Sequence, residues 1–170
     1  ILTLVSCIIC DMDDISNYEK LRADTHAFFL TLKPIHSPAL NELVHFSAES
    51  FNHILYKGSR RERDRSSQIM RFKLLPRAIK LIGYSTTYQE YEETIKEFEV
   101  KTRKTKTRKS KKVQYWGIIA ITENRKIKVI LRKIGDNGIL HFWSIIPAWT
   151  TNKFRDTKFV STMKGNPDED

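Results

Sequence analysis

The apolar residues in the first half of the chain recur at helical spacing and predict three helices. The first covers residues 13–32, and two prolines follow it closely. The second begins at Ser47 or Ser50, either of which can cap it, and ends at Gly58. The third covers residues 64–83, where a proline inside the pattern predicts a kink or a break.

The last third of the chain has the apolar pattern of β-strands. Residues 113–121 form a continuous apolar run, typical of a strand that is buried on both faces. Residues 126–134 alternate and predict a second strand. The Gly-Asp-Asn-Gly turn at 135–138 joins it to a third strand, 139–146, which Pro147 ends. Short turns between three strands predict an antiparallel meander.

Helices followed by strands indicate an α+β fold, with N-terminal helices packed on one face of a C-terminal antiparallel β-meander. We expect a single domain over residues 13–160, followed by an acidic tail at 161–170. The apolar segment 1–12, whose role the sequence leaves open, is shorter than the roughly 20 residues that span a bilayer. We therefore expect a cytoplasmic protein whose main body does not enter a membrane.

The net charge of +10 comes almost entirely from one segment, KTRKTKTRKSKK at residues 101–112. Without it, 22 basic and 20 acidic residues remain. It follows an acidic block with five Glu in residues 90–99, so residues 87–112 predict an exposed hairpin, a mobile loop or a long β-arm. We expect its basic residues, together with Arg60, to bind the phosphates of RNA, or of DNA. They are Lys101, Arg103, Lys104, Lys106, Arg108, Lys109, Lys111 and Lys112.

Several kinds of chemistry lack their motifs in this chain. It contains no GxSxG, Walker A, GxGxxG or HExxH sequence. Cys7 and Cys10 form a CxxC without a second pair, and a structural zinc site needs four ligands. The histidines do not cluster with carboxylates at ligand spacing, so we expect neither a metal nor a cofactor. Histidine, hydroxyl groups and positive charge are the reagents that remain.

These reagents suit RNA cleavage without a metal. His53 and Lys57 are four residues apart and project from the same side of the second helix, and Arg61 follows in a basic loop. Histidine exchanges protons near neutral pH, and Lys and Arg stabilise the charge that develops on a phosphate. His53 can equally be a half-buried polar residue of an amphipathic helix. His45 is ambiguous, since it precedes this helix and could point into the same site, and we do not count it among the candidates.

The third predicted strand adds a second group of candidates. Alternation places His141 and Trp143 on one face and Phe142 and Ser144 on the other. His141 can equally be a cross-strand neighbour of aromatic residues, and Ser144 an ordinary strand serine. The basic residues of the third helix, Arg71 among them, are expected on its solvated side.

The sequences FSAESFNHILYKG, MRFKLLPRAI and HFWSIIP occur here in the order strand–helix, helix and closing strand. This layout, over roughly Leu43–Trp149, resembles the phage-associated branch of the barnase–EndoU–colicin–RelE (BECR) ribonuclease superfamily. The resemblance implies helices packed on an antiparallel sheet of four or more strands, and metal-independent cleavage of RNA, often by toxins. The helix histidine of the pattern falls on His53, the basic position on Lys57, and the closing-strand polar residue on Ser144.

We therefore expect an endoribonuclease, a toxin or phage-related effector, that cleaves RNA through its 2′-OH. His53 would be general base or acid with His141 as its partner, Lys57 and Arg61 would hold the scissile phosphate, and Ser144 would orient it. Two alternatives stay open. The chain is a non-catalytic nucleic-acid-binding module, or it is an interaction domain whose basic run contacts an acidic protein surface or is a localisation tag. As a toxin, it would have an acidic immunity or antitoxin protein as a further expected partner.

Overall fold

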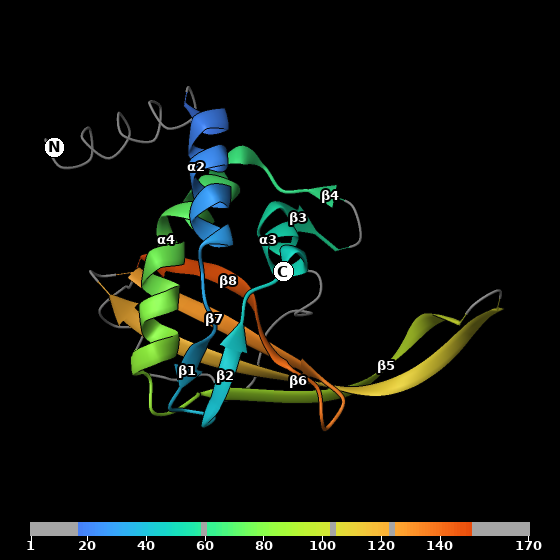
Figure 1. Cartoon of the computed structure of the whole chain (residues 1–170). Helices are drawn as coiled ribbons and strands as arrows, with labels where there is room; N and C mark the ends of the chain where they lie inside the picture. Colours follow the sequence, from blue (N-terminus) through green and yellow to red (C-terminus); the bar gives the residue numbers. More distant parts are fainter. Residues whose placement is uncertain (1–16, 59–60, 103–104, 123–124, 151–170) are drawn as a thin grey trace, which may run out of the picture.

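Helices α2, α3 and α4 lie on one side of a six-stranded sheet in the computed structural model of the chain (Figure 1). The structure describes residues 17–58, 61–102, 105–122 and 125–150, without the side chains of 101–102, 105–107, 122, 125 and 148–150. The predicted α+β class, with helices packed on one face of an antiparallel meander, is confirmed.

The three predicted helices are present as α2 (Tyr18–Leu30), α3 (Ala48–Leu55) and α4 (Arg65–Tyr84). Ser47 caps α3, since its side chain accepts a hydrogen bond from the Ser50 backbone N–H at 3.3 Å. Asp64 caps α4 in the same way, through the backbone N–H of Ser67 at 2.8 Å. The predicted start of the first helix, before residue 17, lies outside the described residues.

The structure changes two helix predictions. Of the kink or break predicted at the proline, the break is absent, because helix α4 continues through Pro76. The apolar stripe on both sides of the proline packs against the core, and packing outweighs local propensity. Helix α3 ends at Leu55 instead of Gly58. The chain there turns into β3 (Tyr56–Lys57), which pairs antiparallel with β4 (Arg61–Glu62).

The main sheet has the strand order β1-β2-β8-β7-β6-β5. Strands β6, β7 and β8 form the predicted antiparallel meander, and β5 adds to its far edge. On the other edge β2 pairs with β8 in parallel, and β1 pairs with β2. The strands are β1 (Ile35–Ser37), β2 (Glu42–His45), β5 (Glu90–Thr102), β6 (Thr105–Thr122), β7 (Arg125–Ile134) and β8 (Leu140–Thr150).

Strand β8 departs from the prediction at two points. It continues past Pro147, which lies opposite Ile127. No described strand pairs with the outer edge of β8 there, so the missing N–H of proline breaks no ladder. A β-bulge shifts the register, so Phe142 lies opposite Leu131 but Ser144 lies opposite Ile130. Simple alternation predicts that Ser144 shares the face of Phe142, but because of the bulge it does not.

Two apolar clusters cover the two faces of the sheet. The larger one joins the helices to the sheet and includes Leu75 and Ile82 of α4 and Leu131 and Phe142 of the meander. The smaller one lies on the other face and consists of Val113, Tyr115, Ile130 and Trp143, with Phe98, Ile134 and Ile146 against it. The meander is thus buried on both faces, as its apolar run predicts. Within the described residues, no helix is long and apolar enough to cross a membrane.

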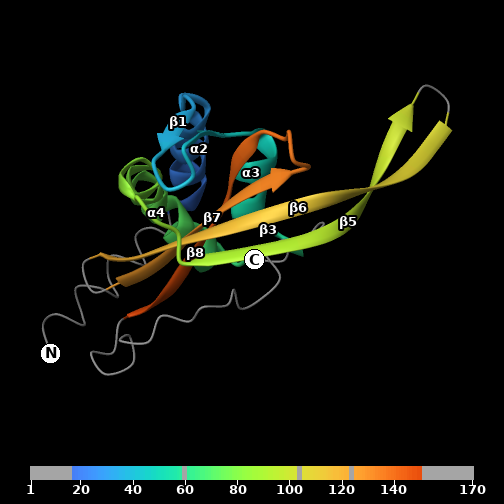
Figure 2. The ribbon, with the colours of Figure 1, turned by 90° about the horizontal axis from the view of Figure 1, so that it is seen from below.

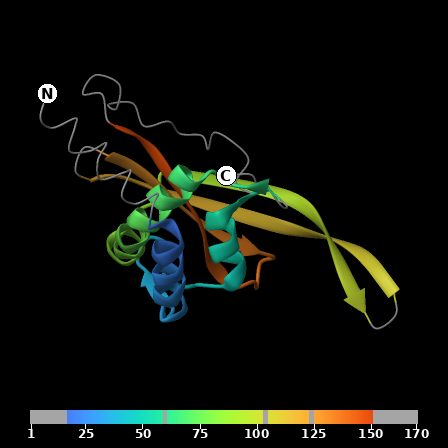
Figure 3. The ribbon, with the colours of Figure 1, turned by 90° about the horizontal axis from the view of Figure 1, so that it is seen from above.

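The charged excursion is a long β-arm. Strands β5 and β6 pair without interruption from Glu90 opposite Gly117 to Thr102 opposite Thr105. Figures 2 and 3 show this ribbon twisting and projecting well beyond the helices and the rest of the sheet. Of the forms that the sequence left open, the described residues contain a long β-arm in which the two strands pair as a hairpin.

Candidate functional site

Helix α3 and strand β8 meet where His53 contacts Trp143. Their ring centroids are 4.3 Å apart, and the planes are tilted by 38°. Phe51 and Ile54 turn the apolar side of α3 towards the main core, which leaves His53 on its other side. His53 is only 7% exposed and Trp143 only 4%, so this contact is buried.

Arg132 of β7 also lies over the indole ring. Its guanidinium carbon is 3.2 Å from the ring centroid of Trp143, a cation–π arrangement. Its Nη2 also lies 3.1 Å from a carboxylate oxygen of Glu49, one helical turn before His53. Arg132 is directly opposite His141 in the β7–β8 register. The arginine therefore joins α3, β7 and β8 at one point.

His141 also faces a second histidine. The parallel pairing of β2 with β8 places His45 opposite His141, with ring centroids 6.1 Å apart. The Nδ1 atom of His141 is buried and has no hydrogen-bond partner in the described part of the chain. Burial first, then His45 and Arg132, lower the pKa of His141, and Glu49 opposes this shift. The imidazole is consequently neutral at neutral pH.

Tyr115 and Lys96 extend the cluster towards the arm. Lys96 Nζ donates a hydrogen bond to the Tyr115 hydroxyl at 3.1 Å. Burial raises the pKa of Tyr115 to about 12, so the phenol stays protonated in the physiological range. Burial, and then the charge of Arg132, lower the pKa of Lys96. Tyr115 lies opposite Arg132 in the β6–β7 register, so the polar residues form one continuous group.

The structure brings together only some of the candidate residues. His53 and His141 belong to the cluster around Trp143 and Arg132, and His45 lies beside His141. Lys57 and Arg61 lie opposite each other in the β3–β4 hairpin and line a different hollow. Its other lining residues are Glu62, Arg63, Asp64, Arg65 and Ser67. Arg60 lies outside the described residues.

Ser144 serves a buried contact with helix α4. Arg71 Nη1 donates to the backbone carbonyl of Ile145 and lies 3.4 Å from the Ser144 hydroxyl. Arg71 is 3% exposed and Ser144 is fully buried, so the prediction that Arg71 lies on the solvated side of its helix is wrong. The Ile145 carbonyl that Arg71 contacts lies on the outer edge of β8, where no described strand pairs with it. Because this carbonyl needs a hydrogen-bond donor, the buried position of Arg71 is favoured.

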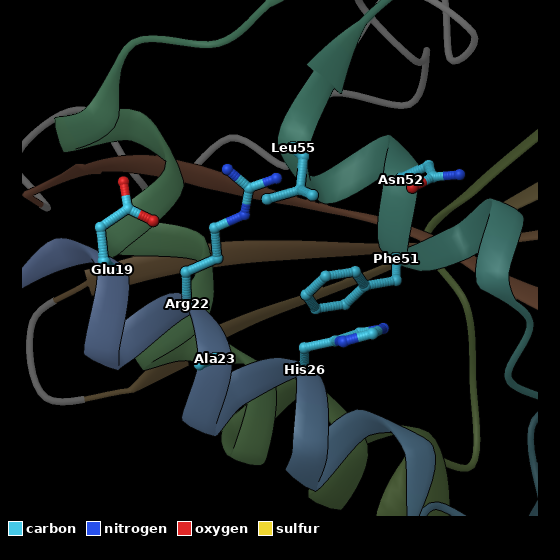
Figure 4. A pocket seen from close by; sticks show the side chains of 7 residues that line it. All are labelled: Glu19, Arg22, Ala23, His26, Phe51, Asn52 and Leu55. Atoms are coloured by element: carbon cyan, nitrogen blue, oxygen red, sulfur yellow. The ribbon is translucent and has the colours of Figure 1, made fainter.

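A second surface hollow lies between α2 and α3 (Figure 4). There the ring of His26 packs on that of Phe51 with centroids 4.6 Å apart. Arg22 approaches Leu55 at the opposite end of the hollow. The remaining lining residues are Glu19, Ala23 and Asn52. None of the residues around Trp143 lines this hollow, so His26 stands apart from the cluster.

Four residues of the cluster were not singled out from the sequence: Arg132, Glu49, Tyr115 and Lys96. The sequence could have indicated Glu49, since it is four residues before His53 and thus on the same side of the helix. The indication for Arg132 is weaker, because alternation shows only that it lies on the other face of its strand from Leu131. Only the register with β8 shows that it faces His141.

The basic run is partly neutralised within the arm. Lys112 contacts Glu93 at 3.7 Å and Asp136 at 2.6 Å, and Arg108 contacts Glu97 at 3.8 Å. Lys109 and Lys111 are exposed. The side chains of the other predicted nucleic-acid-binding residues lie outside those that the structure describes: Lys101, Arg103, Lys104 and Lys106.

Comparisons with protein-family models, with curated proteins and with solved structures give no match to this chain. Among the described residues, no three His, Cys, Asp or Glu side chains gather where they would hold a metal ion.

The opposing charges around His141 give a prediction that needs no substrate. We expect Arg132→Gln to raise the pKa of His141 and Glu49→Gln to lower it further, because these groups act on it in opposite directions. An NMR titration of the imidazole resonances measures both shifts. Shifts of the same sign in both variants would contradict the site geometry.

The lowered pKa of His141 also makes the stability of the fold depend on pH. Because the folded-state pKa of His141 is below the ordinary 6.5, the stability that His141 contributes is present above pH 6.5 and is lost as the pH falls through the folded-state pKa.

Proposed function

We propose that the protein is a metal-independent endoribonuclease that cleaves RNA by attack of a 2′-OH on the adjacent phosphate. The observation that carries this proposal is the pairing of His45 with His141, 6.1 Å apart, beside a guanidinium that lies opposite His141 in the sheet. Two imidazoles and one fixed cation are the groups that this transesterification requires.

The two histidines divide the proton transfers. Neutral His141 takes the proton of the 2′-OH as its oxygen bonds to phosphorus, which its lowered pKa favours. His45 gives a proton to the 5′-oxygen as the P–O bond breaks, which yields a 2′,3′-cyclic phosphate and a free 5′-OH. These roles differ from the one expected for His53, whose ring is buried against Trp143 and is better placed to position the indole.

Arg132 stabilises the negative charge on the phosphorane. Its guanidinium is held over the Trp143 ring, so little side-chain entropy is lost when an anion binds. The Glu49 carboxylate occupies an anion position beside it with 67% of its side chain accessible, whereas the Arg132 side chain is only 10% accessible. A phosphate that takes the place of Glu49 keeps this buried guanidinium paired with an anion, so no uncompensated charge is left behind.

The remaining sequence candidates have supporting roles. Lys57 and Arg61 line the basic hollow beside the β3–β4 hairpin, where they would bind flanking phosphates instead of the scissile one. Ser144 is buried at the Arg71 contact and holds the end of the site in place. The resemblance of the FNHILYK helix and the HFWSIIP strand to BECR ribonucleases supports the same activity. A role as a toxin or phage-related effector, with an acidic immunity partner, is proposed from that resemblance alone.

An assay in EDTA tests the proposal. We expect the purified protein to cut 5′-labelled RNA and to leave 2′,3′-cyclic phosphate ends, while RNA with 2′-O-methyl groups stays intact because its 2′-oxygen cannot attack. The pH is varied between about 5 and 9, on both sides of the ordinary histidine pKa. No cleavage over this range, or equal cleavage of the methylated strand, would rule out the mechanism.

The projecting arm favours a second candidate, a nucleic-acid-binding module without catalysis. A ribbon that extends beyond the body and carries exposed lysines can bind RNA whether or not the histidines react (Figure 2). Binding that weakens steeply with salt, with no cleavage of any substrate in the same assay, would support this alternative.

A further inference from the structure

The β5–β6 arm sorts its charges between its two faces. Cross-strand partners share a face, and side chains alternate along each strand. On one face the acidic residues of β5 meet basic residues of β6, as in the pairs Glu97–Arg108 at 3.8 Å and Glu93–Lys112 at 3.7 Å. Asp136 adds a second partner to Lys112 at 2.6 Å. The described positive charges on this face, those of Arg108 and Lys112, are therefore balanced within the protein.

The opposite face of the arm carries lysines instead. Lys111 is the cross-strand partner of Lys96, and Lys109 is the partner of Phe98, so these four side chains lie on one face. Phe98 packs against the smaller apolar cluster, which fixes this face as the one that bears Trp143. Lys109 and Lys111 are exposed, and the described part of the chain offers neither of them an ion-pair partner. The uncompensated charge of the described arm therefore lies on this face.

The lysine face is continuous with the candidate site. Lys96 bonds to Tyr115 at 3.1 Å, Tyr115 lies opposite Arg132, and Arg132 stacks on Trp143. Glu92, half-buried opposite Tyr115, is the acidic residue at this junction. A polyanion on the lysine face would thus be led along the sheet to the guanidinium beside the paired histidines.

We propose that the arm face formed by Lys96, Lys109 and Lys111 binds the phosphates of single-stranded RNA and guides the strand to Arg132. Lys109 and Lys111 are two residues apart, about 6.8 Å along a strand, similar to the spacing of phosphates in an extended chain. A duplex groove can admit a two-stranded ribbon, but it would also bring the glutamates of the balanced face close to phosphates, which disfavours duplex binding. The choice of RNA as ligand rests on the proposed function.

Two charge-matched double variants test this face. Lys109→Gln with Lys111→Gln removes two charges from the lysine face, and Arg108→Gln with Lys112→Gln removes two from the balanced face. The probe is a fluorescent single-stranded 2′-O-methyl RNA, which cannot be cleaved, and binding is followed by anisotropy over a salt series. We expect the first variant to lose about 1.4 log units, roughly 25-fold, at 0.1 M salt, with a salt slope reduced by about 1.4. We expect the second to stay close to wild type.

Equal losses in the two variants would overturn the proposal, because net charge alone would then explain binding. No loss in the first variant, or tighter binding of duplex RNA or duplex DNA than of the single strand, would overturn it as well. A dinucleotide substrate separates this proposal from the ribonuclease, since it is too short to reach the arm from Arg132. We expect both variants to cleave it as wild type does. If no variant cleaves any RNA but the binding difference holds, the arm assignment stands and the ribonuclease proposal fails.

Discussion

Replacing His141 by Gln is expected to slow RNA cleavage by about 10²–10⁴-fold, the usual effect of removing a general base or acid. The amide keeps a polar group at the position opposite Arg132 but cannot accept the 2′-OH proton at neutral pH. Initial rates on a dinucleotide and on a longer RNA, both in EDTA, measure the effect. The acid limb of the wild-type pH–rate profile should lie below pH 6.5, because burial, His45 and Arg132 lower the pKa of His141.

His36→Gln is the matched control for this variant. His36 is an exposed residue of β1, two strands away from β8, and its Nε2 lies 3.2 Å from the side-chain oxygen of Asn41. Its replacement makes the same chemical change and should leave the rate within about twofold of wild type, as for surface substitutions generally. A similar loss in both variants would show that the His141 effect is not local.

Replacing Trp143 by Ala is expected to lower the free energy of unfolding by about 3–5 kcal/mol, as for other buried aromatic residues. The indole is 4% exposed and contacts both the His53 ring and the Arg132 guanidinium, so its removal leaves a cavity with a buried charge beside it. Urea unfolding followed by circular dichroism measures the change.

Tyr84→Ala serves as its control, since this aromatic residue at the end of α4 is 81% exposed. Its truncation should change the free energy of unfolding by less than about 0.5 kcal/mol. If Trp143→Ala is no more destabilising than Tyr84→Ala, Trp143 does not hold the cluster together.

Local sequence patterns predict most of the fold. The helical apolar spacing locates α2, α3 and α4, and capping chemistry sets the starts of α3 at Ser47 and of α4 at Asp64. The turn at 135–138 and the flanking alternation predict the β7–β8 hairpin. These features depend on neighbours within a few residues, so the sequence displays them directly.

Features that depend on pairing between segments far apart in the sequence cannot be predicted from local patterns. The parallel pairing of β2 with β8 joins segments that no local pattern connects, and the bulge at Trp143 depends on the register with β7. A shift of one residue in register exchanges the two faces of a strand. The sequence could therefore name His141 as a candidate but could not place Arg132 opposite it or His45 beside it.

The predicted placement of His53 and Lys57 on one helix shows a related limit of local patterns. His53 and Lys57 share a side only while the helix continues, and it ends at Leu55 because the chain turns into the β3–β4 hairpin. Lys57 and Arg61 are thereby directed to the basic hollow, whereas His53 remains against Trp143. Helix length, which is the least certain part of a local prediction, decides which of these residues meet.

The parallel pairing of β2 with β8 also determines when the site exists. His45 and His141 belong to the first and last parts of the described chain, so their contact closes a long loop, and contacts of this kind form slowly. The β5–β6 arm, in contrast, is a local hairpin that can form early. A chain still being synthesised can therefore present its basic arm before residue 141 has left the ribosome, but it cannot yet bring the two histidines together.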